Sequence, residues 1–415
     1  MIPLQPVRGT HDLLPEDFRN QKSVADLACK ISELYGFQEM TPPVFELSEV
    51  FDRTLGETSD VVTKEMYSFK DRGGDVITLR PEFTAGIARA FLTNGLTQQI
   101  PVKFFSRGPV FRHERPQKGR FRQFHQINVE VIGSPSPVTD IEVIALGAHI
   151  LEELGLSDDI NLKLNTLGDL DSRLYYRTKL TEYLLPFQNE LSKDSQLRLR
   201  RNPLRIFDSK DSGDQKILHE APLLKDYLND ISCKFFDDVC AGLSELGIAY
   251  HIDTRLVRGL DYYTHTAFEF VTSNLGAQGT VMAGGRYDGL IKAMSGKVVP
   301  GIGWAAGIER LAIMRGSVDA PSRLISVIPI NPNLEKDALK LTKKLRDNGI
   351  AADIGYTGNM KKRMARANKL GSPFCVIIGE DELTRDNILL RNMKTGEQVE
   401  VPLAKLKEHL ACQFS

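Results

Sequence analysis

Two runs of strand character, joined by a short basic loop, constrain this chain more than any other feature. Residues 102–114 read VKFFSRGPVFRHE, residues 123–133 read QFHQINVEVIG, and the loop between them contains RPQKGR. In the second run, Phe124, Gln126, Asn128 and Glu130 alternate with Ile127, Val129 and Val131. A period of two is typical of a half-buried strand, and a short polar loop joins antiparallel neighbours. The sequence therefore predicts a long antiparallel hairpin with a basic tip.

This hairpin carries a strong local charge in a chain whose formal net charge is only −1. From Lys103 to His125 there are seven lysines and arginines against one acidic residue. Arg112 follows two apolar residues in a strand that looks half-buried, where an unpaired charge is rare. Because the planar guanidinium fork matches phosphate oxygens, Arg112 favours a polyphosphate site, with Glu130 facing the same cleft from the other strand. A solvated hairpin with surface ion pairs is the alternative.

The rest of the chain predicts two unlike domains. Antiparallel strands with helices indicate an α+β domain over residues 1–320, and the helix-rich, charged stretch at about 168–247 reads as an insertion. From residue 323 to 415, strands and helices alternate, which predicts a small α/β domain with mostly parallel strands. Helices are expected at 18–35, 84–96, 139–155, 333–348 and 359–370, and further strands at 249–253 and 267–272.

Several common functional classes are disfavoured by the sequence. The five cysteines form no CxxC pair, so neither a disulfide framework nor a structural zinc site is expected. We find no secretory leader and no run of membrane-spanning length, which indicates a cytoplasmic protein without a membrane partner. GLIKAMSGKVV lacks the spacing of a phosphate-binding P-loop, and GIGWAAG lacks that of a dinucleotide fingerprint.

Three further stretches carry charge where apolar residues prevail. RPEFTA places Glu82 and Thr84 at a helix start, where the acid either caps the helix or grips a substrate ammonium. GIERL places Arg310 on an apolar helix, either in an ion pair or aimed at polyphosphate. LVRGLDYYTHTAFEF sets Arg258, Tyr262 and Tyr263 before a strand. The residues alone thus indicate a binder of ATP-like polyphosphate, with chemistry carried by electrostatic positioning.

Taken together, these segments resemble the bacterial-type histidyl-tRNA synthetases, a family of class II aminoacyl-tRNA synthetases, over the whole chain. GFQEMTPPVFE is similar to class II motif 1, FRHERPQKGRFRQFHQINVEVIG to motif 2, and PGIGWAAGIERLAIM to motif 3. LVRGLDYYTHTAFEF and AGGRYDGL resemble the two histidine-specific signatures of the family. The last 90 or so residues resemble its anticodon-binding domain.

The resemblance implies a fold and a reaction. The fold is a six- or seven-stranded antiparallel sheet with flanking helices, a helical insertion and a C-terminal α/β domain. The reaction is a ligase reaction of protein biosynthesis. L-histidine attacks the α-phosphate of ATP to give histidyl-adenylate, and the histidyl group then passes to the 3′ end of tRNA(His). Magnesium accompanies ATP, no metal is held by the protein alone, and the enzyme is a cytoplasmic homodimer.

The resemblance also implies site residues. Arg112 and Arg258 are expected to be catalytic at the α-phosphate, and Arg310 to hold the γ-phosphate. The remaining ATP contacts are expected from Glu114, Arg120 and Phe124. Histidine is expected to contact Glu82, Thr84, Gln126, Glu130, Tyr262, Tyr263 and Tyr287, with Glu130 and Tyr263 at the imidazole nitrogens. Arg115 and Gln117 are expected to face the acceptor end of the tRNA.

Two departures from the family pattern and two rival interpretations stand beside this reading. Phe83 replaces a frequent glycine, and Phe121 replaces a frequent tyrosine. One rival is the regulatory subunit of ATP phosphoribosyltransferase, which shares the catalytic fold without the anticodon domain. The other is a class II synthetase for another amino acid, which the RGLDYY and GGRYDG signatures disfavour.

Overall fold

The computed structural model describes residues 4–55, 61–117, 119–257, 262–276, 279–318 and 323–414. The chain divides into two compact units, Met1–Val318 and Asp319–Ser415, and each is described by itself. The predicted boundary between residues 320 and 323 falls at residues 319–322, which lie outside the described residues.

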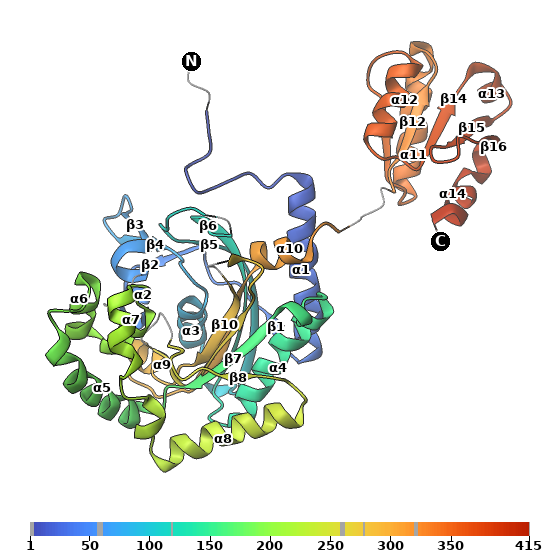
Figure 1. The fold of residues 1–415 in the computed structure, drawn as a ribbon. Helices are drawn as coiled ribbons and strands as arrows, with labels where there is room; N and C mark the ends of the chain where they lie inside the picture. Colours follow the sequence, from blue (N-terminus) through green and yellow to red (C-terminus); the bar gives the residue numbers. More distant parts are fainter. Residues whose placement is uncertain are drawn as a thin grey trace. The chain divides into compact units, whose positions relative to one another are not determined.

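One eight-stranded sheet, in the order β1-β5-β6-β11-β10-β9-β7-β8, forms the centre of the first unit (Figure 1). Its strands are β1 (Gln38–Glu39), β5 (Val102–Phe111), β6 (Gln123–Ile132), β7 (Asn161–Thr166), β8 (His251–Ile252), β9 (Thr264–Val271), β10 (Thr280–Arg286) and β11 (Gly301–Gly307). The six strands from β5 to β7 in this order run antiparallel to their neighbours.

The two edges of this sheet differ from the prediction. A six-stranded antiparallel core is confirmed, but β1 pairs parallel to β5 and β8 pairs parallel to β7, so the sheet is mixed. Both edge strands have only two residues. A run of two residues contains no alternation that sequence patterns detect, and its pairing direction depends on where distant segments return.

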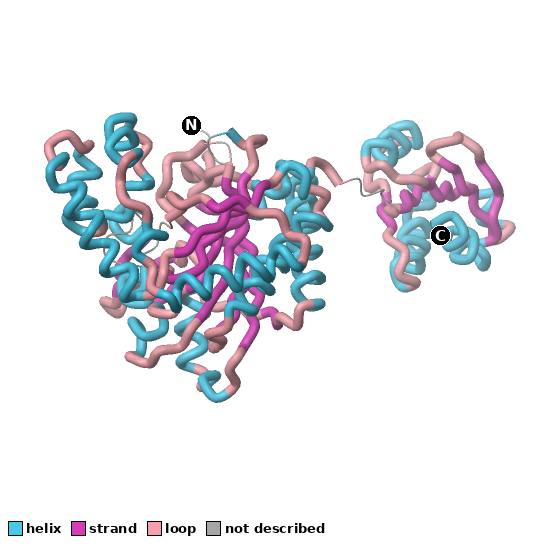
Figure 2. Tube along the Cα trace, turned by 60° about the horizontal axis from the view of Figure 1, so that its bottom comes forward, coloured by secondary structure: helices cyan, strands magenta, loops and turns pink. Residues whose placement is uncertain are grey.

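Helices cover both faces of the sheet (Figure 2). One face packs under α1 (Pro15–Leu34), α4 (Pro137–Glu153), α8 (Asp230–Glu245) and α10 (Ile308–Arg315). The other packs under α2 (Glu49–Leu55), α3 (Thr84–Thr93), α5 (Leu170–Leu184) and α9 (Leu290–Ser295). No helix within the described ranges is both long enough and apolar enough to cross a membrane.

The predicted hairpin is confirmed as β5 and β6, paired from Val102 opposite Ile132 to Phe111 opposite Gln123. Ile127, Val129 and Val131 are at most 1% exposed and belong to the core under α1 and α4. Because side chains alternate across a strand, the polar residues between them face the opposite side of the sheet. That side holds the cavity described below.

Two smaller substructures complete the first unit. A three-stranded sheet has the order β2-β4-β3, with β2 (Phe45–Leu47), β3 (Tyr67–Lys70) and β4 (Val76–Leu79). Between β7 and β8 the chain forms α5, α6 (Lys193–Arg201), α7 (Ser212–His219) and α8. Its buried Asp214 accepts hydrogen bonds from the hydroxyls of Ser192, Ser195 and Ser209, which ties α6 and α7 together. That this helical segment is an insertion stays a prediction.

The second unit is a five-stranded sheet in the order β13-β12-β14-β15-β16. Its strands are β12 (Ile325–Pro329), β13 (Ala352–Ile354), β14 (Phe374–Ile378), β15 (Asn387–Asn392) and β16 (Gln398–Pro402), and its helices are α11 (Glu335–Asp347), α12 (Met360–Lys369), α13 (Glu380–Thr384) and α14 (Leu406–Phe414). The first three strands are parallel as predicted. β15 and β16 are antiparallel, because a short turn leads directly from one to the other.

Candidate active site

A cavity of about 370 Å³ opens on the polar face of the β5–β6 hairpin. Strands β6, β9, β10 and β11 and the starts of α3 and α10 contribute to its wall. Twelve predicted site residues line it, namely Glu82, Thr84, Arg112, Glu114, Arg120, Phe124, Gln126, Glu130, Tyr262, Tyr263, Tyr287 and Arg310. Residues more than 200 positions apart thus meet in one place.

Two of the predicted residues do not line this cavity, and a third lies outside the described residues. Arg115 and Gln117 are exposed in the loop between β5 and β6 and do not line the cavity. Arg258, and Asp261 beside it, lie outside the described residues.

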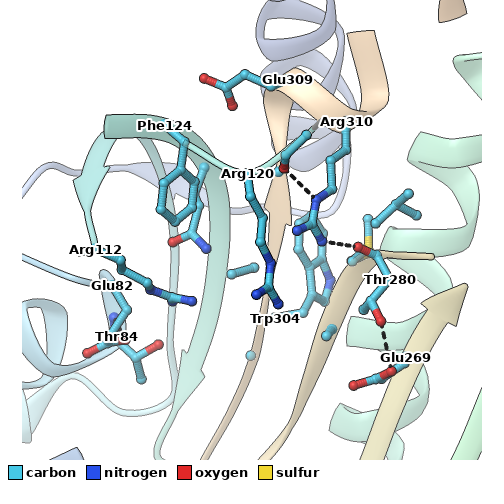
Figure 3. A pocket seen from close by; sticks show the side chains of 18 of the residues that line it. Glu82, Thr84, Arg112, Arg120, Phe124, Glu269, Thr280, Trp304, Glu309 and Arg310 are labelled. Carbon is cyan, nitrogen blue, oxygen red and sulfur yellow. Dashed lines mark hydrogen bonds between the residues drawn. The ribbon is translucent and has the colours of Figure 1, made fainter. Parts of the chain in front are cut away.

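Three guanidinium groups converge on one side of the cavity (Figure 3). Arg112 donates from Nε to the Pro81 carbonyl oxygen at 2.9 Å and lies over the Phe124 ring at 5.5 Å. Nη1 of Arg120 lies 3.0 Å from Oε2 of Glu114. Glu114 also lies within 3.9 Å of Arg112. One carboxylate is therefore shared by two cations that point into the cavity.

Arg310 is the third cation, and backbone carbonyls hold it in place. Its Nε donates to the Gly119 oxygen at 3.1 Å and its Nη1 to the Thr280 oxygen at 2.5 Å. Burial lowers the pKa of Arg310, and the charges of Arg120 and Arg112 lower it further, against the opposing effect of Glu114. Because like charges repel in this half-buried space, a bound anion is favoured between them.

The alternative that Arg310 takes part in an ion pair is not seen among the described residues, and its neighbour Glu309 bonds elsewhere. The Glu309 carboxylate accepts from the backbone N–H of His125 at 2.9 and 3.0 Å and faces the His125 Nδ1 at 2.8 Å. In Figure 3 it lies apart from the guanidinium groups. Glu309 thus connects α10 to the start of β6, while Arg310 is left to the cavity.

Glu130 forms the floor of the cavity and is only 1% exposed. It accepts hydrogen bonds from Thr84 Oγ1 at 2.5 Å, from Asn128 Nδ2 at 3.1 Å and from the Tyr287 hydroxyl. Burial raises the pKa of Glu130 to about 8, despite the lowering effect of these three donors. A carboxyl group with this pKa is poised to exchange a proton near neutral pH.

Two of the polar atoms beside Glu130 are buried without a hydrogen-bond partner among the described residues. They are Oε1 of Gln126, which lines the cavity, and Oδ1 of Asn128. A buried acceptor without a donor is costly, so such atoms point to a missing ligand or water. A substrate ammonium offers the donors that Gln126 lacks.

Of the two alternatives left open for Glu82, the helix cap is confirmed, and the contact with a substrate ammonium stays a prediction. The Glu82 carboxylate accepts from the backbone N–H groups of Thr84 at 2.6 Å and Ala85 at 2.8 Å, which caps the start of α3. It also lines the cavity, and burial raises its pKa. The capping bonds fix the direction of a carboxylate that still has acceptor capacity for a substrate.

The three tyrosines form an aromatic wall next to Glu130. The ring centroids of Tyr262 and Tyr263 are 4.6 Å apart, and those of Tyr262 and Tyr287 are 5.8 Å apart. Burial raises the pKa of both Tyr262 and Tyr287 well above the usual phenol value. The phenols of Tyr262 and Tyr287 therefore stay protonated and act as hydrogen-bond donors at neutral pH.

Glycines of β11 explain why GIGW resembles a nucleotide fingerprint without being one. A Cβ atom on Gly303 would lie 1.9 Å from Glu130 Oε2, and one on Gly301 would lie 2.2 Å from the Tyr287 ring. These contacts are too short for any side chain. The two glycines make room for buried cavity residues.

The two departures from the family pattern lie in different environments. Phe83 is fully buried under the Arg80 guanidinium, 4.1 Å from its ring centroid, and does not line the cavity. Phe121 does line the cavity and packs against His11, with the ring centroids 4.4 Å apart and the rings tilted by 45°. Only Phe121 thus changes the chemistry of the cavity wall.

Sequence reasoning missed several residues of the site. Glu269 and Thr280 line the cavity and are joined by a hydrogen bond of 3.0 Å from the Thr280 hydroxyl. The period of two in β9 and β10 places them on the cavity face, but their facing each other depends on strand register. Asn128 was placed on the polar face of its strand, but its bond to Glu130 was not anticipated.

Arg286, in the GGRYDG signature, has a structural role. It is fully buried and pairs with the equally buried Asp140 of α4 through Nε at 3.1 and 3.2 Å. Asp140 also accepts a hydrogen bond of 2.5 Å from Thr266. This network ties the end of β10, which leads into Tyr287, to α4 and β9.

Comparisons with known proteins agree with this geometry. Residues 9–181 and 204–311 match the model of the histidyl-tRNA synthetase family, and residues 325–413 match the model described as an anticodon binding domain. The chain is 55% identical over 413 residues to a histidine–tRNA ligase of Rhodospirillum rubrum, covering 99% of both proteins. It is 51% identical over 411 residues to that of Gluconobacter oxydans, again covering 99% of both.

Among solved structures, the apo histidyl-tRNA synthetase of S. aureus superposes with a TM-score of 0.83 at 35% sequence identity. The match covers 98% of this chain and 100% of that one. Sequence family, fold and the residues of the cavity thus point in one direction: the chain belongs to the histidyl-tRNA synthetase family of class II aminoacyl-tRNA synthetases.

Proposed function

We propose that this chain activates L-histidine with ATP to give histidyl-adenylate and pyrophosphate, and then transfers the histidyl group to tRNA(His). One observation carries the proposal. A single cavity combines three converging guanidinium groups with a floor of buried carboxyl and phenol groups. The cations suit a polyphosphate, and the floor suits a small side chain that both donates and accepts hydrogen bonds.

In this proposal the arginines bind ATP. Arg112 holds the α-phosphate, Arg310 the γ-phosphate, and Arg120 lies between them. Phe124 stacks on adenine, and Glu114 contacts it after releasing Arg120 to the phosphates. Arg120 lies 3.0 Å from Glu114. Because the ATP phosphates carry more negative charge than one carboxylate, an exchange of partners by Arg120 is favoured when ATP binds.

The floor binds histidine. Glu130 and Tyr263 satisfy the two imidazole nitrogens, with Tyr262 and Tyr287 beside them. Glu82, Thr84 and Gln126 hold the ammonium and carboxylate end, which gives the partnerless Gln126 Oε1 a donor. A site of buried polar groups rejects amino acids that leave those groups unpaired, by about 10⁴- to 10⁵-fold in comparable synthetases. No separate hydrolytic editing site is then needed.

Magnesium enters as part of the substrate, MgATP. Within the described residues, no group of three or more His, Cys, Asp or Glu side chains is arranged to hold a metal ion. The arginines of the cavity suit the phosphates of ATP. The residues present therefore fit a magnesium ion that is coordinated mainly by phosphate oxygens. When bound, magnesium neutralises the phosphate charge of the nucleotide.

We assign Arg258 to the α-phosphate on the family resemblance. Tyr262 and Tyr263, the next described residues along the chain, both line the cavity. A second cation beside Arg112 stabilises the negative charge that grows on the α-phosphate as the histidine carboxylate attacks.

The tRNA is proposed to contact both units. Arg115 and Gln117 are exposed at the hairpin tip, next to the cavity but outside its wall, where the acceptor end arrives. Residues 1–320 thus form the catalytic domain and residues 323–415 the anticodon-binding domain. The match of residues 325–413 to an anticodon binding domain supports the latter assignment.

A homodimer in the cytoplasm completes the proposal. Phe45 and Leu47 of β2 are 55% and 53% exposed, and Phe69 of β3 is 49% exposed. A small sheet with exposed large apolar side chains fits a self-complementary interface formed around motif 1. Translation places such an enzyme in the cytoplasm.

Pyrophosphate exchange with ATP tests the activation step. The purified chain is expected to exchange labelled pyrophosphate into ATP only when histidine is present. Exchange with another amino acid and none with histidine would assign a different synthetase specificity. Exchange with no amino acid, from a folded protein, would favour a non-catalytic regulatory subunit.

A further inference from the structure

A tyrosine in the second unit has no role in the reaction described so far. Tyr356 follows β13 and is 68% exposed. The Arg366 guanidinium of α12 lies over its ring, 5.7 Å from the centroid. Arg366 in turn donates from Nε and Nη2 to the two carboxylate oxygens of Asp353, at 3.2 and 3.3 Å. The ring is thus supported by an oriented cation on one face while most of its surface remains open to solvent.

Arg363 binds the loop that carries Tyr356. This buried side chain donates from Nε to the Gly358 oxygen at 2.8 Å and pairs with Glu335. It also reaches the Pro329 oxygen at the end of β12, at 3.4 Å. Arg363 therefore has a structural role, since it ties the loop after β13 to the end of β12 and to α11.

Exposed apolar surface and free positive charge gather at the same end of the sheet. Ile330 and Met360, which follow β12 and begin α12, are 40% and 37% exposed. Lys361 and Lys362 are exposed on the first turn of α12, and no ion pair joins either one to another described residue. The acidic neighbours Asp353 and Glu335 are already paired. Lys361 and Lys362 therefore carry the positive charge at this end of α12, while the acidic first turn of α13 lies near Ile330.

An aromatic ring backed by a cation and flanked by lysines fits an unpaired nucleotide. Bases stack on aromatic side chains and arginine planes, while phosphates attract nearby cations. Open α/β sheets bind ligands outside the carboxyl ends of their strands, which is where Tyr356 lies. A protein partner would instead be expected to bury a larger apolar surface with few lysines.

We propose that Tyr356 is the stacking platform for one unpaired base of the tRNA, with Arg366 supporting its ring and Lys361 and Lys362 contacting adjacent phosphates. The proposal rests on the proposed function, in which tRNA is the acceptor. It names a positioning contact remote from the chemistry, so it predicts effects on tRNA binding that leave amino-acid activation unchanged.

Steady-state aminoacylation with the full-length chain tests the platform. Tyr356→Ala is expected to raise the KM for tRNA by about 5- to 100-fold, which corresponds to ~1–3 kcal/mol of lost stacking per base. Tyr356→Phe, which keeps the ring, is expected to stay within about threefold of wild type. Histidine-dependent pyrophosphate exchange needs no tRNA and is expected to be unchanged in both variants.

Leu339→Ala is the matched control. Leu339 lies on α11 of the same unit and is 57% exposed, but its side chain is not aromatic and cannot stack on a base. It is expected to leave the KM for tRNA unchanged. An unchanged KM in Tyr356→Ala would overturn the proposal. Absence of exchange in the wild-type chain would instead refute the proposed function, so the two failures are distinguishable.

Abasic substitution identifies the base. tRNA transcripts that lack one base at a time in the anticodon loop are compared with wild type and with Tyr356→Ala. At the stacked position, the two losses are expected not to add, because both remove the same contact. Losses that add at every loop position would contradict stacking. Replacing Lys361 and Lys362 by alanine is expected to weaken the salt dependence of binding equally for all these transcripts.

Discussion

At the scale of single residues, the Glu130 carboxylate can occupy the floor of the cavity only because Gly303 beside it has no side chain. The Glu130 carboxylate is buried, bonded to three donors and pressed against a strand that has glycine at position 303. The sequence predicts Glu130, because a lone acid in an alternating strand is conspicuous. It does not reveal the need for Gly303, since that depends on the register between β6 and β11.

Gly303→Ala tests this packing. The new Cβ would lie 1.9 Å from Glu130 Oε2 and 2.2 Å from the Val129 oxygen, so either the carboxylate or the strand must move. We expect the free energy of unfolding to fall by about 1–3 kcal/mol, which lowers the melting temperature. We also expect at least a tenfold rise in the KM for histidine in pyrophosphate exchange. Gly289→Ala is the control, because its Cβ would meet nothing within 4 Å. Equal behaviour of the two variants would contradict the account.

The raised pKa of Glu130 predicts a pH dependence of stability. The folded protein keeps the proton up to a pKa of about 8, whereas the unfolded carboxyl loses it near the ordinary value of 4.5. Between these values the folded state binds more protons, so the contribution of Glu130 to stability falls as the pH rises from about 5 to 8. In Glu130→Gln this fall disappears.

Unfolding in urea between pH 5 and 8, followed by fluorescence, measures that difference. The single tryptophan, Trp304, is buried in β11 and reports on the first unit. The unfolding free energy of Glu130→Gln, relative to wild type, is expected to rise by a few kcal/mol across this range. A difference that stays constant with pH would show that Glu130 is ionised in the folded state throughout.

Arg258 is the residue whose proposed role depends most on the family resemblance. Arg258→His is expected to slow adenylate formation by more than a hundredfold in single-turnover experiments, because a fixed cation at a developing charge is worth several kcal/mol. Histidine affinity, measured by equilibrium titration, is expected to change much less. Near-normal adenylate formation in this variant would refute the assignment of Arg258 to the α-phosphate.

At the scale of elements, patterns that recur within one segment were predictable and pairings between distant segments were not. The long strands β5 and β6 and the helices α1, α3 and α4 have periodicities that a reader of the sequence can recognise. The strand expected at 249–253 is present as the two-residue β8, but its parallel pairing with β7, like that of β1 with β5, was not predictable. The same limit applies to the site, where Arg112 and Arg310 were predicted but the link from Glu309 to His125 was not.

That link is a testable connection between α10 and β6. Glu309 accepts from both the backbone and the ring of His125, which adjoins Phe124, while Arg310 follows Glu309 on the helix. We expect Glu309→Ala to raise the KM for ATP by about 10- to 100-fold. This corresponds to the ~1.5–3 kcal/mol that a hydrogen bond to a charged group contributes. The KM for histidine is expected to change by less than threefold, because Glu130 in its floor is held by Thr84, Asn128 and Tyr287 and not by Glu309.

Glu309→Gln serves as the comparison in exchange kinetics, because it keeps an acceptor for the His125 N–H. It is expected to lie between wild type and Glu309→Ala. A larger effect on the KM for histidine than on that for ATP would contradict the proposed division of the cavity.

At the scale of the whole molecule, two units with separate cores are proposed to divide the reaction. Activation is assigned to the first unit, whose cavity is lined by residues between 82 and 310. Recognition of tRNA is proposed to use the second unit, whose core is formed by residues 325–410. The division was readable in the sequence as a change from an α+β to an α/β pattern. The platform at Tyr356 was not, because the sequence shows basic residues on α12 without telling buried Arg363 from exposed Lys362.

Aminoacylation by the full-length chain tests the central claim most directly, since it requires both units and both steps. Purified protein is incubated with ATP, tRNA(His) and each amino acid in turn, and the charged tRNA is measured. The account predicts ATP-dependent charging of tRNA(His) with histidine and with no other amino acid. Charging with a different amino acid, or histidine-dependent pyrophosphate exchange without any charged tRNA, would contradict it.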